Sequence, residues 1–492
     1  MKYYSTRDVN KQKYDSAEVI KQGLASDGGL FIPEAIPSIT KEDICEMQNM
    51  SYAERAAKIL SLFLSDYTYD ELVSDCKAAY GETSFPEGAA PLNKVTDSIY
   101  SLELWHGPTA AFKDMALQIM PRLLSRALVK TGEQNTALIL VATSGDTGKA
   151  ALEGYKDIDR IKIMVFYPVD GVSKVQKLQM ATQTGNNVNV CSIKGNFDDA
   201  QNGVKKIFSD KEAAKTLLEK SYILSSANSI NWGRLVPQIV YYVSAYCDML
   251  AGGDIEFGET VNVCVPTGNF GNIFAAYIAK LMGLPINKLI CASNANNVLT
   301  NFLESGTYDR NRKFHTTMSP SMDILISSNL ERLLCFAAGE EKTAKYMSDL
   351  ASTGKYTVDA DVKAAIDANF VGFYADECET AQTLKEFYEK YSYLADTHTS
   401  VALNCAEKYM SKYNDGKKMI VASTASPYKF AADVYKSITG TPADSDTAAL
   451  DQLSALTSTE ISYPLRNLTE RKVNFDTVIE ANEMLENVYK FV

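Results

Sequence analysis

The feature that most constrains the fold is a series of short, mostly apolar runs, each followed by a turn and then by a segment with helical spacing. The clearest runs are residues 137–142, 161–167, 188–193, 261–266, 288–293 and 418–423. Runs of this kind are typical of strands that are buried on both faces, and their alternation with helices is typical of parallel sheets. The sequence therefore predicts an α/β fold with doubly wound parallel sheets.

The length of 492 residues is enough for two or more domains with a large core. We expect an N-terminal unit and two doubly wound α/β domains, followed by a polar and mostly helical C-terminal extension. The expected limits of these four parts are residues 1–95, 96–255, 256–440 and 441–492.

Composition excludes several classes of function. The net charge is −12 and no long basic run is present, which argues against nucleic acid as the main partner. No apolar run approaches the ~20 residues of a membrane helix, and no apolar segment follows the first residues as in a secretory signal. The nine cysteines form no CxxC pair and the three histidines are far apart, so we expect a cytoplasmic protein without a disulfide frame or a metal site.

A lysine stands at a predicted loop-to-helix junction. Residues 100–104 alternate large apolar and polar side chains, as a half-buried strand does, and Gly107-Pro108 then breaks the pattern. From Ala111 onward the apolar residues have helical spacing, so Lys113 lies near the start of a helix, among Phe112 and Met115. An apolar surrounding lowers the pKa of a lysine and frees its amine as a nucleophile, which suggests Schiff-base chemistry with a cofactor such as pyridoxal phosphate. The alternative is an ordinary solvated surface lysine.

Two turns between strands and helices are candidate anion sites. Gly268-Asn269-Phe270-Gly271-Asn272 contains two glycines before a helix, where successive N–H groups and the helix N-terminus can hold a phosphate. The second turn, Ser144-Gly145-Asp146-Thr147-Gly148-Lys149, resembles a nucleotide-binding loop but lacks its first glycine and its last hydroxyl residue. Its hydroxyls and N–H groups are candidates for binding a substrate carboxylate. A plain turn between strand and helix remains the alternative for both.

Four further side chains have a functional and a structural interpretation. Thr424 follows an apolar strand, where its hydroxyl would either contact a pyridine nitrogen or cap a helix. Arg234 would either bind an oxyanion through two donors or form a surface ion pair. His106 and His398 are more typical of structural histidines with satisfied hydrogen bonds.

Several of these segments together resemble the threonine synthase family, pyridoxal phosphate enzymes of fold type II, in its longer bacterial and fungal form. The resemblance covers nearly the whole chain and is carried by the following segments: 26–31, 106–114, 143–148, 228–234, 268–272 and 320–324. One departure is visible, because the family often has histidine where this chain has Ser426.

The resemblance implies specific roles. Lys113 would hold pyridoxal phosphate covalently, Gly268, Asn269, Phe270, Gly271 and Asn272 would bind its phosphate, Asp146 would lie near the ring hydroxyl and Thr424 would face the ring nitrogen. Ser144, Gly145, Thr147 and Arg234 are the candidates for binding the substrate.

The implied reaction converts O-phospho-L-homoserine and water to L-threonine and phosphate, with Lys113 moving protons. The small-molecule substrate would be the main partner of a monomer or homodimer. Alternatives are a lyase of the same fold that eliminates phosphate and releases a 2-keto acid, an inactive relative that acts as a binding protein, and a nucleotide-binding enzyme.

Overall fold

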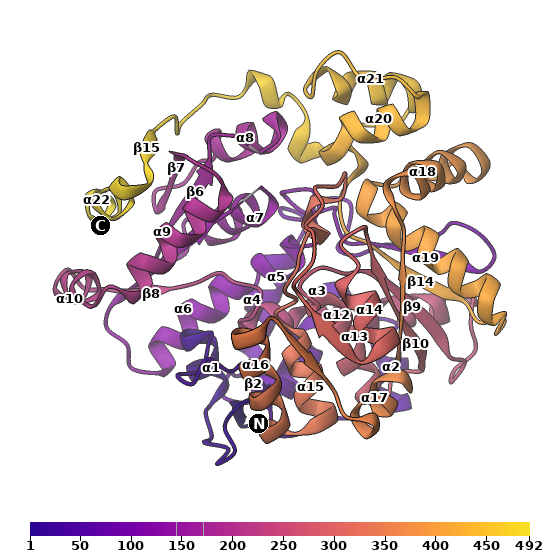
Figure 1. The fold of residues 1–492 in the computed structure, drawn as a ribbon, viewed down its shortest axis with the longest axis horizontal. Coiled ribbons are helices and arrows are strands. Elements are labelled where there is room, and N and C mark those ends of the chain that lie inside the picture. Colours follow the sequence, from indigo (N-terminus) through magenta and orange to yellow (C-terminus); the bar gives the residue numbers. More distant parts are fainter. Residues whose placement is uncertain (144, 171) are drawn as a thin grey trace.

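The computed structural model describes residues 1–143, 145–170 and 172–492 of the chain (Figure 1). Within these residues one sheet has five strands, in the order β15-β7-β6-β5-β8. A second sheet of the same described residues has six strands, in the order β13-β10-β9-β14-β4-β3. In these two sheets every neighbouring pair of strands is parallel except β3 and β4. The predicted α/β fold with parallel sheets is therefore confirmed.

The smaller sheet is built from the first series of apolar runs. Its strands are β5 (Thr136–Ala142), β6 (Ile161–Pro168), β7 (Val188–Lys194), β8 (Tyr222–Ser225) and β15 (Val478–Glu480). The helices between them are α7 (Asp146–Tyr155), α8 (Lys174–Ala181), α9 (Phe197–Ser209) and α10 (Lys211–Glu219), with α6 (Met120–Lys130) preceding β5. The centres of β5 and β6 are buried on both faces, as the apolar runs predict.

The larger sheet takes the later runs. Its strands are β3 (Leu92–Lys94), β4 (Ile99–Glu103), β9 (Val261–Pro266), β10 (Ile286–Ser293), β13 (Phe370–Tyr374) and β14 (Met419–Ser423). The helices around it include α12 (Pro237–Ala251), α13 (Gly271–Leu281), α14 (Val298–Ser305) and α19 (Thr397–Tyr413). Because parallel strands end at the same edge of a sheet, the turns after β4, β9 and β14 meet there.

Strand β4 differs from the prediction in two ways. All five of its residues are buried, so the half-buried prediction is wrong. The polar face is covered because Ser101 Oγ lies 2.6 Å from Tyr393 Oη, which also donates to Glu103 Oε1 at 3.2 Å. In addition, β4 pairs with β14 and β3, whereas the predicted domain of residues 96–255 grouped it with β5. An alternating pattern identifies a strand but does not identify its neighbours.

The two ends of the chain attach to different parts of the fold. At the N-terminus, β1 (Tyr3–Ser5) pairs with β2 (Phe31–Pro33), followed by α2 (Lys41–Met47), α3 (Tyr52–Phe63) and α4 (Tyr69–Tyr80), while α1 (Ser16–Gln22) lies between the two strands in sequence. At the C-terminus, α20 (Ala431–Thr439) and α21 (Ala448–Thr457) precede β15, which joins the smaller sheet beside β7, and α22 (Met484–Phe491) ends the chain (Figure 1). The C-terminal extension therefore adds a strand as well as helices.

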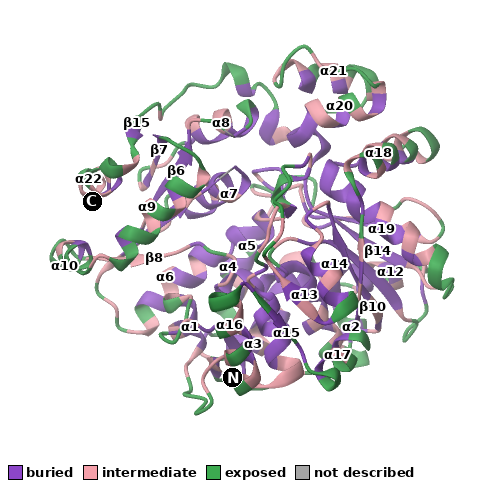
Figure 2. Cartoon of the chain, in the orientation of Figure 1, coloured by how far each residue is buried: buried purple, intermediate pink, exposed green. Residues whose placement is uncertain are grey.

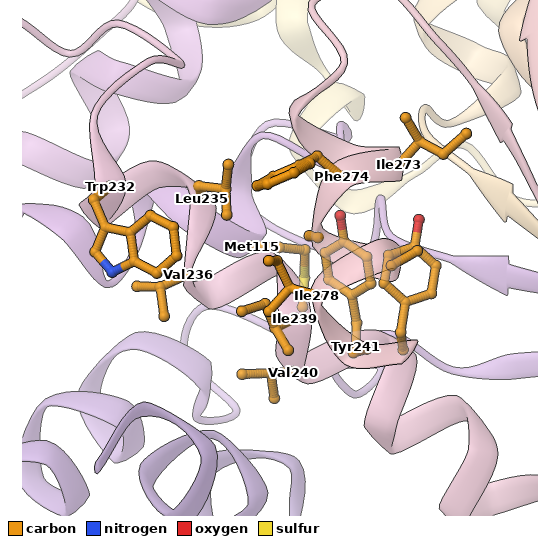
Figure 3. Close-up of a cluster of buried hydrophobic side chains, with 14 of the residues drawn as sticks. Met115, Trp232, Leu235, Val236, Ile239, Val240, Tyr241, Ile273, Phe274 and Ile278 are labelled. Atoms are coloured by element: carbon orange, nitrogen blue, oxygen red, sulfur yellow. The ribbon is translucent and has the colours of Figure 1, made fainter. Parts of the chain in front are cut away.

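The predicted lysine loop leads into a continuous hydrophobic core, to which Met115 belongs. Burial is concentrated in the sheets and in α12 and α13, whereas α10 and parts of α18 (Glu377–Tyr391) and α21 are exposed (Figure 2). Figure 3 shows Met115, from α5 (Asp114–Leu117), among side chains of α12 and α13. Pro237 begins α12 directly after the short α11 (Trp232–Leu235).

Among the described residues, no helix has the length and apolar character needed to cross a membrane. The described part of the chain also contains no cluster of three or more histidine, cysteine, aspartate or glutamate side chains suited to a metal ion. All nine cysteines are free thiols, and seven of them are buried.

Candidate active site

Backbone hydrogen bonds fix the position of the loop that carries Lys113. It follows β4 and pairs with the segment after the neighbouring strand β14: Phe112 N–H donates to Thr424 O at 2.8 Å, and Ser426 N–H donates to Ala110 O at 3.0 Å. Lys113 immediately precedes α5, as the sequence predicts. The lysine is thus fixed at the edge where parallel strands end, the usual place for a ligand in open α/β sheets.

Lys113 is not a surface lysine. Its side chain is 12% exposed, and its Nζ lies 3.6 Å from Asp146 Oδ2 and donates to Ser321 Oγ at 3.5 Å. Burial lowers the pKa of Lys113, the nearby cations of Lys429 and Arg234 lower it further, and Asp146 opposes them. A larger share of the amine is therefore unprotonated and nucleophilic than in an ordinary lysine.

Asp146, at the start of α7, lies between two lysines. Lys429 Nζ lies 3.1 Å from Asp146 Oδ1, and Gln176 Nε2 donates to the same oxygen at 2.7 Å. Burial opposes the charge of Asp146, but Lys429 and Lys113 hold the pKa of this carboxyl below its ordinary range. The site therefore contains an ionised carboxylate, buried and shared by two amines.

Sequence reasoning missed Lys429. Its side chain is 0% exposed, and its Nζ also donates to Thr109 O at 2.7 Å, so it joins the loop after β14 to the lysine loop. The sequence contains the same signal that singled out Lys113: Lys429 stands among apolar residues, shortly after the predicted site residue Thr424. Lysines are almost never buried without a partner, so such a position indicates an ion pair.

The turn of residues 268–272, called the cup below, follows β9 and opens α13. Phe270 has φ +63° and α13 begins at Gly271, so the first N–H groups of this helix have no partner within the helix. A Cβ at Gly268 would lie 2.7 Å from Ser321 O, which explains the glycine. Such a turn, with the positive end of a helix dipole, is suited to a phosphate.

The side chain of Asn272 supports the same interpretation of the cup. Its Oδ1 accepts hydrogen bonds from Tyr241 Oη at 2.7 Å and from Tyr242 Oη. Its Nδ2 is buried and has no hydrogen-bond partner among the described residues. A buried amide donor without a partner is costly, so an acceptor is expected beside it. The cup and Asn272 therefore fit the phosphate group of a cofactor.

Ser321 lies between the cup and the two charged side chains. Its Oγ accepts from Lys113 and donates to Asp146 Oδ2 at 3.4 Å, while its carbonyl oxygen approaches Gly268. Its N–H donates to His398 Nε2 at 3.1 Å, so that nitrogen carries no proton, and His398 Nδ1 donates to Asp396 Oδ2 at 2.7 Å. His398 is fully hydrogen-bonded, as expected, and it also supports the site.

Arg234 is buried rather than exposed, so the surface ion pair considered above is wrong. It is 4% exposed, its Nη1 donates to Ala227 O, and its Nε has no hydrogen-bond partner among the described residues. Those residues place no carboxylate within ion-pair distance of the guanidinium. Burial lowers its pKa to about 10. A buried cation without an anion of its own is suited to binding an anionic ligand.

The turn before α7 is partly occupied by its own hydrogen bonds. Thr143 Oγ1 accepts from the N–H groups of Gly145 and Gly148, both at 3.0 Å. Gly145 has φ +152° and its Cβ position would clash with the amide of Gln176. Thr147 is the second residue of α7 and is half-buried, whereas Ser144 lies outside the described residues. The substrate role of this turn stays a prediction.

Comparison with known proteins covers the whole chain. The family models that match are the threonine synthase N terminus over residues 2–80, the pyridoxal-phosphate dependent enzyme over 84–424 and the threonine synthase C-terminal model over 399–488. Threonine synthase of Saccharomyces cerevisiae is 36% identical, with 89% of each chain covered. Threonine synthase of Pseudomonas aeruginosa is 37% identical, with 89% of this chain and 90% of that protein covered.

A solved structure is similar to this chain over its whole length. A pyridoxal-phosphate-bound threonine synthase from Brucella melitensis has a TM-score of 0.89 and 37% identity, and covers 100% of this chain and 99% of its own. Human threonine synthase-like 1 is 39% identical over 86% of this chain, and the chain spans 58% of its length. The match to full-length relatives and to three family models supports one conclusion: the chain belongs to the threonine synthase family of pyridoxal-phosphate-dependent enzymes.

Proposed function

We propose that this protein is a threonine synthase, which converts O-phospho-L-homoserine and water to L-threonine and phosphate. The observation that carries the proposal is the buried amine of Lys113 beside the ionised Asp146, with the cup close by through Ser321. Family membership supports the same chemistry.

The residues divide into those that hold the cofactor and those that act on substrate. Lys113 would hold pyridoxal phosphate covalently, and Gly268, Asn269, Phe270, Gly271 and Asn272 would bind its phosphate. Asp146 would lie near the ring hydroxyl and Thr424 near the ring nitrogen. When bound, the cofactor supplies an electron sink for negative charge at the substrate carbons.

Lys113 also supplies the proton transfers. Because burial lowers the pKa of Lys113, its amine is better suited to act as a general base, and its protonated form as a general acid, than an ordinary lysine. We propose that it removes protons from the α and β carbons and delivers protons to the α carbon and to the γ carbon, which becomes the methyl group of threonine. The phosphate leaves from the γ carbon and water adds at the β carbon.

Binding of the doubly charged substrate requires donors in a dry site. Arg234 is the candidate for the substrate phosphate, because it is a buried cation without a carboxylate partner among the described residues. The turn of residues 144–148 is the candidate for the substrate carboxylate, with Gly145 and Thr147 as its described members and Ser144 outside them.

Product analysis tests the proposal. Purified protein is incubated with O-phospho-L-homoserine, with and without added pyridoxal phosphate, and threonine, phosphate and 2-oxobutyrate are measured. Threonine and phosphate in equal amounts support the synthase. Phosphate with 2-oxobutyrate and ammonia, but without threonine, would instead indicate an eliminating lyase, and no product with any added cofactor would contradict both.

The proposal includes a cytoplasmic location and a monomeric or homodimeric state. The free cysteines support a reducing compartment, because buried thiols without disulfides are typical of cytosolic proteins. Size-exclusion chromatography with light scattering measures the oligomeric state directly.

A further inference from the structure

The N-terminal unit is hydrogen-bonded to a helix whose preceding residue, Asn329, contacts the cup. Helix α15 (Leu330–Ala338) begins with Glu331 and Arg332 in its first turn. Arg7 donates to Glu331 through two bonds, Nε to Oε1 at 2.8 Å and Nη2 to Oε2 at 2.7 Å, and Thr6 Oγ1 donates to Oε1 at 2.6 Å. This paired geometry fixes the orientation of both side chains.

Arg332 connects the same helix to two other segments of the family resemblance. It is fully buried, and burial lowers its pKa to about 9. Its Nε donates to Phe31 O at 3.0 Å and its Nη2 to Ile230 O at 2.6 Å, while its Nη1 donates to Asn329 Oδ1. Three segments that are distant in sequence are therefore joined by one guanidinium.

Asn329 in turn bonds the cup. Its backbone N–H and its Nδ2 both donate to Asn269 O, at 3.1 and 2.9 Å. Ser327 Oγ donates to Gly268 O at 2.7 Å. The carbonyl oxygens of the cup are thus held by the segment before α15. A peptide unit whose carbonyl is fixed also has a fixed N–H direction, because the unit is planar.

We propose that Arg7, Glu331 and Arg332, called the clamp below, are positioning residues for cofactor binding: they fix Asn329 so that the cup presents its N–H groups to the cofactor phosphate. This inference rests on the proposed binding of that phosphate in the cup. The inference gives the N-terminal unit a role in cofactor affinity, although Arg7, the clamp residue of that unit, bonds Glu331 and not the cup.

The test compares two ligands on full-length protein freed of cofactor. Arg7→Gln removes the paired bonds to Glu331 at a position where the arginine side chain is 30% exposed, so folding is expected to persist. Binding of pyridoxal phosphate and of pyridoxal, which lacks the phosphate, is followed by absorbance. We expect the variant to bind pyridoxal phosphate about 5- to 10-fold more weakly, within the usual range of coupling between sites. Its affinity for pyridoxal should be unchanged.

The matched control is Lys11→Gln. Lys11 Nζ pairs with Glu340 Oε1 at 2.8 Å, so it also ties the N-terminal segment to a helix start, that of α16 (Glu340–Thr353), which lies outside the clamp. The control should bind both ligands as the wild type does. Glu331→Gln is the second clamp variant and should reproduce the loss for pyridoxal phosphate alone.

Two outcomes would overturn the inference: clamp variants that bind pyridoxal phosphate as tightly as the Lys11→Gln control, or variants that lose both ligands equally, as general loosening of the fold would cause. Gly268→Ala distinguishes a failure of the clamp inference from an error in the proposed phosphate site. A Cβ at Gly268 would meet Ser321 O at 2.7 Å, so this variant disturbs the cup itself. If Gly268→Ala weakens the binding of pyridoxal phosphate alone and the clamp variants do not, the cup is the phosphate site and only the clamp inference is wrong. If Gly268→Ala has no effect, the phosphate site itself is wrong, and the clamp inference falls with it.

Discussion

Replacing Lys429 by methionine tests the buried charge cluster most directly. At an effective dielectric constant of ~20, two unit charges at the observed 3.1 Å attract by about 5 kcal/mol. Breaking a buried pair by removing one partner costs about 3–5 kcal/mol, because the other charge stays buried. Asp146 would keep Gln176 and the more distant Lys113, so we expect a loss near the lower end, about 3 kcal/mol.

The measurement is urea unfolding of the cofactor-free protein at pH 7, followed by circular dichroism and tryptophan fluorescence. The informative comparison is a double-mutant cycle with Asp146→Asn. Since the double variant leaves no uncompensated Asp146 charge, it should recover most of the loss of Lys429→Met. A single variant that costs less than about 1 kcal/mol, or a double variant that is no more stable than the single one, would refute the reasoning.

Three further predictions concern individual side chains. Lys113→Ala removes the proposed attachment point, so borohydride treatment with pyridoxal phosphate should label no peptide of residues 106–120, whereas the wild type should be labelled there; the same label in both proteins would contradict the assignment. Arg234→Gln should raise KM for O-phospho-L-homoserine about 10- to 100-fold, the value of one or two charge-assisted hydrogen bonds, and an unchanged KM would exclude Arg234 from substrate binding. Asp114 concerns pH: burial raises its pKa to about 6, although Thr109 donates two hydrogen bonds to it. Because this pKa is raised in the folded state, ionisation costs the folded protein about 3 kcal/mol, absent below about pH 4 and complete above about pH 6. The stability of Asp114→Asn relative to the wild type should therefore increase between pH 4 and 7 in urea unfolding, and a constant difference would contradict the shift.

The sequence was informative where a local pattern fixes a local structure. Continuous apolar runs marked β5, β6 and β9, and the glycines of the cup marked a turn whose backbone approaches another segment. Desolvation by neighbouring apolar residues singled out Lys113, and its pKa is lowered for that reason. Each of these inferences needs only residues that are close in sequence.

Properties that depend on partners distant in sequence were not accessible in the same way. The polar residues of β4 suggested an exposed face, yet Tyr393 and His106 cover Glu103. Lys429 follows β14 and bonds Thr109 of the loop after the neighbouring strand β4, whereas its partner Asp146 follows β5 of the other sheet, and an apolar pattern does not give strand order. Arg332 is a further case, since two of its three acceptors, Phe31 O and Ile230 O, come from segments distant in sequence.

The departure at position 426 shows how a change of side chain redirects a local contact. Ser426 caps the turn of residues 427–430 by accepting from Tyr428 N–H at 3.2 Å, and its Oγ lies 2.6 Å from Ser462 Oγ in the C-terminal segment. Its side chain therefore bonds the C-terminal segment, and the imidazole that supports the site belongs to His398, oriented by Asp396 and bonded to Ser321. A histidine at 426 would have to displace the contact with Ser462, so in this chain the C-terminal segment takes the space that a larger side chain would need.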